Sequence, residues 1–494
     1  MTSHPALTGS SPRIRYAARV ATTVGSGARP TVADEHRRRH DRRLAAVLGA
    51  IVVAGAGFRL WHLGASRLNY DESFTAIAGR MPLGAMLTHL RLSDSHPPLD
   101  YLVRAPLARA GVSEGFIRLP SALCSIAALA LFAWWMRGRG RIAVLATLMM
   151  ALNAFEITYG REARMYAELE LIGVAAAVPV DAWIRGPRRW HAPLAGVLTA
   201  IVLLTHTSGL LLAPGLLLVP GSRTDRDAWS WRAAIGTGAL VWMVLWGRVF
   251  LVQAHGHHSS WIPRSTLTRA VSTMASLVSP IDAVALLAVG ALAVGGVLIV
   301  RGRDRAIART WLCLFVLPVT LAIVLGRFSP VLLDRTLTLF AWGAPFAIAV
   351  VLDAVIPRTI ADSAIVVAVI VALLLPGAGR TARATSGPTP ALNELVAVAR
   401  PGDIVAIEPM SKQVELQWTL GVRSRSGPTR RVRLDIARTP ALELTAAPST
   451  GRVWLLDFDG TTPRFTGLAR CAPDWFHKPY RIECLEARAL TSHA

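Results

Sequence analysis

Long apolar runs, separated by short polar segments, fill the chain from residue 44 to residue 376. Runs of about 18 or more apolar residues are long enough to cross a bilayer as helices. The pattern therefore predicts an α-helical polytopic membrane protein with about eleven transmembrane helices. The predicted spans are 44–63, 117–136, 142–159, 166–184, 192–206, 207–220, 233–252, 281–300, 309–326, 331–352 and 359–376.

One apolar stretch, 192–220, is longer than a single span, and the polar residues Thr205-His206-Thr207-Ser208-Gly209 interrupt it. We expect two short helices that meet at this break, with His206 at the outer end of the hairpin. An ionisable side chain at membrane depth indicates a functional site, and His206 could bind substrate or a metal ion. The structural alternative is a histidine bonded to a backbone carbonyl at the helix break.

The two ends of the chain are polar. Residues 1–43 are rich in Arg, Ser and Thr and are predicted to be a disordered cytoplasmic tail. No apolar stretch precedes the arginine cluster at 37–43, so the first span is expected to double as the targeting signal. Residues 377–390 are predicted to be a linker. The mixed pattern of residues 391–494, with a helical stretch at 391–399 and two strand-like runs at 404–407 and 453–458, predicts a small extracytoplasmic α/β domain.

Arginine clusters fall in every second loop between the predicted spans, and they set the orientation. Cytoplasmic loops of membrane proteins carry an excess of Lys and Arg. The N-terminus is therefore expected in the cytoplasm, with the first outer loop, 64–116, outside a plasma membrane. The net charge is +22. Because many of the arginines lie in these short loops, their positions argue against a nucleic-acid partner. The clusters lie within 37–43, 137–141, 185–189, 223–232 and 301–309.

The outer face gathers most of the unusual polar residues. Asp71 and Glu72 follow the first span, and Arg161 and Arg164 lie at a later outer turn. Carboxylates and guanidinium groups on one membrane face suit chemistry on a phosphate-linked substrate. This arrangement favours an enzyme over a channel or a scaffold.

Five motifs in order carry a family resemblance. The chain resembles the GT-C glycosyltransferases, in the family 39-like branch that contains protein O-mannosyltransferases and lipid A aminoarabinose transferases. The likeness covers roughly 44–376 and is strongest in 68–166. It departs at Thr205, where relatives often have a basic residue. The motifs are Tyr70-Asp71-Glu72, His96-Pro97-Pro98-Leu99, Arg118-Leu119-Pro120-Ser121, Tyr159-Gly160-Arg161-Glu162-Ala163-Arg164-Met165-Tyr166 and Thr205-His206-Thr207-Ser208-Gly209.

The resemblance implies a GT-C fold and transfer of a sugar from a polyprenyl-phosphate donor to an acceptor hydroxyl at the outer face. It implies inversion at the anomeric carbon with Asp71 as general base. The leaving phosphate would be held by Arg161, Arg164 and Arg335. The acceptor could be a glycan, a lipid or a protein. Transferases that use different sugar donors would share the same charged motifs.

The acidic pair has more than one interpretation. Glu72 could hold a divalent cation together with Asp71, or could orient the acceptor. Alternatively, both acids cap an interfacial helix that begins at Ser73, because acids favour helix N-termini.

The remaining candidates also have structural alternatives. Arg161 and Arg164 would share a helix face and bind phosphate, or reach lipid head groups. His96 could bind acceptor, metal or sugar, or a loop carbonyl. Tyr166 is a substrate contact or an interface anchor. Asp334 could neutralise Arg335.

Histidines and cysteines are less informative. The loop His255-Gly256-His257-His258 is expected to be a flexible lid or substrate loop, because its spacing fits no standard metal site. Cys471 and Cys484 could form a disulfide in an oxidising compartment. Cys124 and Cys313 fall inside predicted spans, where they would only pack.

Two other functions fit parts of the pattern. A non-catalytic transporter or flippase of lipid-linked glycans would place charges deep in several helices along a path. Here the charges lie at one membrane face. A degenerate transferase that serves as an assembly partner would not need the acidic pair and both arginines.

Overall fold

The structure of the protein is a computed structural model. The structure describes residues 32–219, 224–255, 262–278, 285–329, 331–357 and 359–383, and four strand segments, 404–408, 452–457, 468–477 and 480–487.

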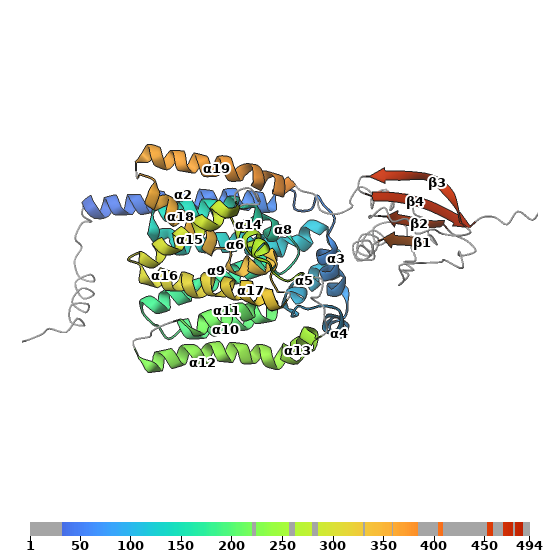
Figure 1. Cartoon of the computed structure of the whole chain (residues 1–494), viewed down its shortest axis with the longest axis horizontal. Helices are drawn as coiled ribbons and strands as arrows, with labels where there is room; N and C mark the ends of the chain where they lie inside the picture. Colours follow the sequence, from blue (N-terminus) through green and yellow to red (C-terminus); the bar gives the residue numbers. More distant parts are fainter. Residues whose placement is uncertain are drawn as a thin grey trace, which may run out of the picture. The chain divides into compact units, whose positions relative to one another are not determined.

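The described part of residues 32–383 is helical (Figure 1). A π-helical segment, Met243–Gly247, joins α12 to α13, and another, Leu312–Val316, joins α16 to α17. The 3-10 segments are Arg137–Arg139 and η5, Asp334–Phe340. The α-helices are α2 Val32–Leu60, α3 Tyr70–Arg80, α4 Leu83–Ser93, α5 Leu99–Ala110, α6 Glu114–Met136, α7 Arg141–Leu152, α8 Ala154–Arg161, α9 Tyr166–Arg185, α10 His191–Thr205, α11 Gly209–Leu217, α12 Asp225–Trp242, α13 Arg248–His255, α14 Leu267–Ser276, α15 Ala285–Arg301, α16 Arg305–Trp311, α17 Leu317–Phe328, α18 Gly343–Val355 and α19 Ile360–Arg383.

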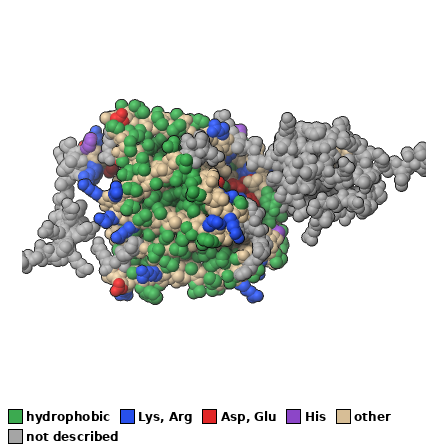
Figure 2. All heavy atoms as spheres, viewed as in Figure 1, with side chains coloured by type: hydrophobic (Ala, Val, Ile, Leu, Met, Phe, Trp, Pro, Cys, Tyr) green, Lys and Arg blue, Asp and Glu red, His purple; other side chains and the backbone are tan. Residues whose placement is uncertain are grey.

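Several helices are suited to a membrane. Of the described helices, five are long and apolar enough to cross a bilayer, or up to seven if two bent pairs each count as one span. Hydrophobic side chains cover much of the face that Figure 2 shows, and exposed ones include Val244, Leu286 and Leu373. Apolar surface of this extent fits contact with lipid. The prediction of an all-helical, multi-span membrane protein is confirmed, and the number of about eleven spans stays a prediction.

The helix boundaries agree with the sequence pattern at residues 205–209 and differ from it at residues 32–43. α10 ends at Thr205 and α11 begins at Gly209, so the predicted break is confirmed. Residues 32–43 are helical, which corrects the predicted disordered tail; residues 1–31 lie outside the described part. An ion pair between Glu35 and Arg39, one turn apart, supports this extension of α2.

Two bends shape the end of the bundle that holds the acidic pair. α7 and α8 meet at 54°, and η5 and α18 meet at 66°. Asn153 stands at the first bend, where its side chain caps α8 and donates to the carbonyl of Leu277. Each bend turns a short helix with a predicted site residue, Arg161 or Arg335, away from the direction of its neighbour.

A missing side chain allows η5 to pack directly on α9. A Cβ atom at Gly173 would lie only 1.9 Å from the carbonyl oxygen of Leu339. Any larger residue would therefore push η5 away from α9. This close contact brings Arg335, at the start of η5, beside Tyr166, at the start of α9.

Three predicted cytoplasmic loops come together. Arg185 pairs with Asp304 at 2.6 Å, and Arg139 lies 3.5 Å from Asp304 and 3.6 Å from Asp181. These contacts join the loops after α6, after α9 and before α16. Figure 1 shows α3, α4 and α5 together at the opposite end of the helical part.

The C-terminal strands form one mixed sheet of order β1-β2-β4-β3. β1 and β2 are parallel, and the other neighbours are antiparallel. Cys484 is disulfide-bonded, whereas the side chain of Cys471 lies outside the described part. The two predicted strand-like runs are confirmed as β1 and β2. The strands are β1 Ile404–Glu408, β2 Arg452–Asp457, β3 Leu468–His477 and β4 Tyr480–Ala487.

Candidate functional site

The two acids of the opening motif point to different partners. Asn69 caps α3 by accepting from the backbone N–H of Glu72, and the Glu72 carboxylate accepts from the backbone N–H of Asn69. This reciprocal pair is a capping box, which satisfies two backbone donors at the helix start. Glu72 thus takes part in capping, as the structural alternative proposed, but Asn69 is the N-cap and α3 begins at Tyr70 and not at Ser73. Asp71 points elsewhere.

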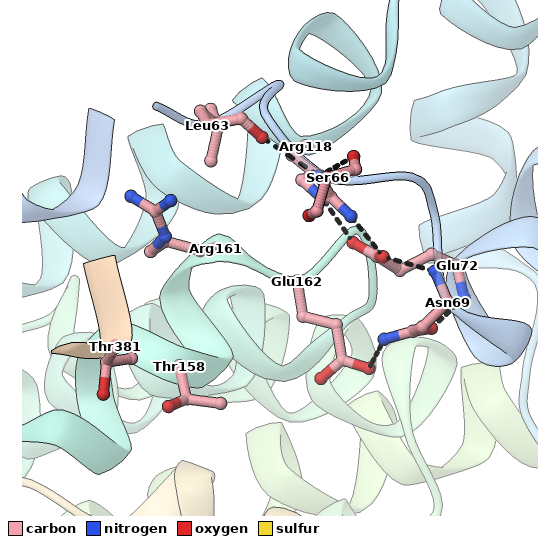
Figure 3. Close-up of a pocket in the computed structure, with 9 residues that line it drawn as sticks. All are labelled: Leu63, Ser66, Asn69, Glu72, Arg118, Thr158, Arg161, Glu162 and Thr381. Atoms are coloured by element: carbon pink, nitrogen blue, oxygen red, sulfur yellow. Dashed lines mark hydrogen bonds and ion pairs between the residues drawn. The ribbon is translucent and has the colours of Figure 1, made fainter. Parts of the chain in front are cut away.

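Glu72 is buried and fully engaged (Figure 3). Arg118 donates to both of its oxygens at 2.7 Å, and the backbone N–H of Ala163 donates to Oε1 at 2.8 Å. Arg118 also donates to the carbonyls of Leu63, Ser66 and Arg67. This pair ties the loop before α3 to α6 and to the turn before α9.

Asp71 faces a more open space. Arg335 Nη1 lies 2.8 Å from Asp71 Oδ2, and the two side chains are 26% and 29% exposed. The guanidinium of Arg335 also lies 5.9 Å from the centre of the Tyr166 ring, a distance typical of a cation–π contact. The structure thus brings together three predicted site residues from distant parts of the chain.

Arg164 lies buried behind this group. It donates to the hydroxyls of Thr75, at 2.8 Å, and Tyr101, at 2.9 Å. Its backbone carbonyl accepts from Arg104 at 2.9 Å and from Ser121 at 3.1 Å. Both ends of the residue are therefore fixed by side chains of α3, α5 and α6.

The two predicted histidines lie against each other with their rings tilted by 49°. The rings of His96 and His206 are 4.7 Å apart, and Nδ1 of His206 accepts from the backbone N–H of Ser208 at 2.9 Å. His96 lies 2.9 Å from Asp94, which also accepts from the Tyr101 hydroxyl. Burial raises the pKa of Asp94, but His96, Arg164 and these hydrogen bonds together lower it well below its usual range.

Arg161 does not join this group. α8 ends at Arg161 and α9 begins at Tyr166, so the predicted helix face shared with Arg164 is wrong. Its guanidinium donates to the carbonyls of Phe58 and Trp61 at the end of α2, at 2.8 and 2.6 Å, and to Ala382 at 3.0 Å. A cation is favourable at a helix C-terminus, because the last carbonyls lack helical partners.

A cavity of about 330 Å3 opens beside Asp71 and Arg335. We call it the histidine cavity. Its lining is mixed. The polar and charged residues are Ser95, His96, His206, Thr207, Ser208, Gln253, Ser329, Arg335 and Thr336. The apolar residues are Leu210, Leu211, Phe250, Ala254, Ile262, Leu325, Val331 and Leu333. A cation together with these apolar side chains suits an amphiphile with an anionic head group.

A second cavity, of about 220 Å3, lies on the Glu72 side of α3 (Figure 3). We call it the Glu162 cavity. Glu162 accepts from the Asn69 side chain at 3.2 Å. Burial, together with the charges of Glu72 and Asp71, raises the pKa of Glu162 to about 7. The lining residues are Leu63, Ser66, Asn69, Glu72, Arg118, Thr158, Arg161, Glu162 and Thr381.

Sequence reasoning left Glu162 and Arg118 without roles, although both stand inside the quoted motifs. A signal for Glu162 was present, since it is an acid between two arginines at an outer turn. A partner for Glu72 could not be read from the sequence, because Arg118 lies 46 residues away.

Glu72, one of the predicted metal ligands, is already paired with an arginine. Glu72 faces the Arg118 guanidinium, an unfavourable neighbour for a bound cation. Among the described residues, no group of three or more His, Cys, Asp or Glu side chains could hold a metal ion. The loop 256–261 and the side chain of His255 lie outside those residues, and a divalent cation stays a prediction.

The fold resembles that of ArnT, a lipid A aminoarabinose transferase of the class that the motifs predict. Two crystal structures of ArnT from Cupriavidus metallidurans share it, one bound to undecaprenyl phosphate (TM-score 0.55) and one in the apo state (TM-score 0.53). Each is 14% identical and aligns over 89% of this chain and 97% of its own. At this identity the likeness establishes the fold. No protein-family model matches the chain, and no curated protein matches it in sequence.

Proposed function

We propose that the protein transfers a sugar from a polyprenyl-phosphate donor to an acceptor hydroxyl, with inversion and with Asp71 as the general base. One observation carries this proposal: Asp71 pairs with Arg335, and Arg335 lines a cavity that combines this cation with apolar side chains. An ArnT structure of the same fold holds undecaprenyl phosphate, which agrees with a lipid phosphate in the histidine cavity.

The residues divide the reaction between them. The acceptor oxygen forms a bond to the anomeric carbon as the bond from that carbon to the phosphate oxygen breaks. The acceptor proton passes to Asp71, and the leaving polyprenyl phosphate gains a negative charge. Arg335, with the buried charge of Arg164 behind it, stabilises that charge, because guanidinium groups match phosphate geometry. The face of the Tyr166 ring contacts the Arg335 guanidinium.

The ion pair also explains how Asp71 becomes available. In the structure, Asp71 and Arg335 neutralise each other at 2.8 Å. A donor phosphate in the histidine cavity would compete for Arg335, since both anions need the same guanidinium. Donor binding then weakens the hold of Arg335 on Asp71 and leaves the carboxylate able to accept a proton. In this scheme Glu72 positions the first turn of α3 and does not react.

We further propose that the site faces the outside of a plasma membrane. The end of the bundle with α3, α4 and α5 lies opposite the loops that carry Arg139, Arg185 and Asp304. Arginine-rich loops are typical of the cytoplasmic side. This orientation and an odd number of spans would put the C-terminal sheet outside the cell as well.

Binding of undecaprenyl phosphate to the purified full-length protein tests this proposal. We expect Arg335→Gln to weaken binding about 10- to 100-fold, because a charge-assisted hydrogen bond is lost. Arg327→Gln is the matched control, since Arg327 is an exposed arginine near the same turn that lines neither cavity described above. Equal affinity for the wild type and Arg335→Gln would contradict the assignment of the histidine cavity to the donor. Movement of the lipid across vesicles without any sugar transfer would indicate a transporter instead.

A further inference from the structure

The Glu162 cavity has no part in the donor chemistry above, although it lies on the other side of the same helical turn. Glu72, which lines it, is the neighbour of Asp71 in the chain. The Asp71 charge also reaches Glu162, since it contributes to raising the pKa of that carboxyl. Asp71 therefore contacts Arg335 of the histidine cavity and acts electrostatically on Glu162 of the other cavity.

The charges of the Glu162 cavity disfavour an anionic ligand. Arg118 is neutralised by Glu72 at 2.7 Å. The Arg161 guanidinium is turned toward backbone carbonyls of α2 and α19. A phosphate in the cavity would meet the carboxyl of Glu162 and would have to compete with backbone carbonyls for the Arg161 guanidinium. Phosphate binding normally relies on a guanidinium or ammonium group whose donors are available.

The remaining polar groups suit sugar hydroxyls. Glu162 offers a carboxyl, Asn69 an amide, and Thr158 and Thr381 offer hydroxyls. Groups of these kinds both donate and accept hydrogen bonds, as a hydroxyl-rich ligand requires. The volume of about 220 Å3 equals that of about seven water molecules. This space suits one sugar ring better than a loop of a folded protein.

We propose that the Glu162 cavity binds the acceptor, and that the acceptor is the terminal sugar of a neutral glycan, with Glu162 bonded to one of its hydroxyls. The inference rests on the proposed transferase function and adds the class of acceptor. Asp71, the chain neighbour of the lining residue Glu72, removes the proton from a hydroxyl of this sugar. The donor carbon approaches from the histidine cavity.

The test uses a strain that lacks this gene, complemented with full-length variants, followed by linkage analysis of its envelope glycans. We expect the deletion strain to lack a sugar that the parent attaches to a hydroxyl of a neutral sugar. Glu162→Gln should lower the amount of this linkage about tenfold or more, because a hydrogen bond to a carboxyl is weakened. Its affinity for undecaprenyl phosphate should stay within about twofold of the wild type.

Two further variants make the result interpretable. Glu114→Gln is the matched control, because Glu114 is an acid of the same end of the bundle that pairs with Arg67 and lies outside the cavity. It should restore the linkage fully. Thr381→Val, a nearly isosteric change on α19, should lower the amount of the linkage several-fold. This variant tests the cavity if Glu162→Gln does not accumulate in membranes.

The outcomes separate the inference from the function on which it rests. If Asp71→Asn restores the linkage as well as the wild type, the proposed function is wrong and the inference falls with it. If Asp71→Asn fails but Glu162→Gln restores the linkage fully, only the acceptor cavity is wrong. A missing sugar that had been attached to a phosphate group or to a protein side chain would also overturn the inference.

Discussion

The first turn of α3 carries two carboxylate–arginine pairs, and the two pairs differ in how deeply they are buried. On one side, Glu72 and Arg118 are at most 5% exposed and hydrogen-bonded to surrounding backbone. On the other, Asp71 and Arg335 are over a quarter exposed and stand beside a cavity. A buried, satisfied pair holds elements in place, whereas a half-open pair can exchange partners with a ligand. Adjacent acids in one motif can therefore have unrelated roles.

The largest effect expected on stability comes from breaking the buried pair. Glu72→Gln leaves the Arg118 guanidinium buried without a counter-charge, which should cost about 3–5 kcal/mol of unfolding free energy. Asp71→Asn, on the exposed side, should cost about 1 kcal/mol or less. Thermal unfolding of both purified variants measures the contrast. A Glu72→Gln protein of wild-type stability that has lost sugar transfer would instead favour the catalytic role that the sequence predicts for Glu72.

The next effect separates the two arginines of the motif at the start of α9. Arg164→Gln should weaken binding of undecaprenyl phosphate about tenfold, because its charge lies behind Arg335. Arg161→Gln should leave that affinity within about twofold, because its contacts are with helix carbonyls. Titration of both variants with the lipid, together with their melting temperatures, gives the comparison. Weaker lipid binding in Arg161→Gln at unchanged stability would restore its predicted phosphate role.

The smallest effect expected is a pH dependence on the Glu72 side. Glu162 accepts a hydrogen bond from Asn69, and the charges of Glu72, Asp71 and Arg164 act on it. Because its pKa is raised to about 7 in the folded protein, the fold favours the protonated carboxyl. The contribution of Glu162 to stability is therefore fully present below its unfolded pKa and is lost as the pH rises through about 7.

Melting temperatures of Glu162→Gln and the wild type across this range test the sign. The variant should gain a few degrees relative to the wild type above about pH 8, with the difference shrinking toward about pH 5. Glu114→Gln serves again as the control. A difference that grows toward acid pH would show that the carboxyl is held ionised in the fold.

Local patterns in the sequence predicted much of this architecture. The break at residues 205–209 was predictable because polar residues interrupt a stretch too long for one span. The positions of the apolar helices followed from the lengths of the apolar runs. The helix at 32–43 was missed because its composition is polar, although Glu35 and Arg39 have the spacing of a stabilising helical pair.

The division of labour in the site could not be predicted from the same signals. Asp71 meets Arg335 across 264 residues, and Arg161 reaches α2 carbonyls across about 100 residues. Such contacts depend on the bends after α7 and before α18 and on the close packing at Gly173. A motif shows which residue types are present, but these tertiary contacts decide which of them face a cavity.

The central claim is that Asp71 removes the acceptor proton. The most direct measurement is the transfer rate of purified Asp71→Asn and wild-type protein from an undecaprenyl-phosphate-linked sugar, with undecaprenyl phosphate binding measured in the same preparations. The account predicts a rate about 100- to 10,000-fold lower for Asp71→Asn, since the general base is lost. Binding of the lipid should be retained, because Arg335 is still present. Transfer by Asp71→Asn at the wild-type rate would contradict the account.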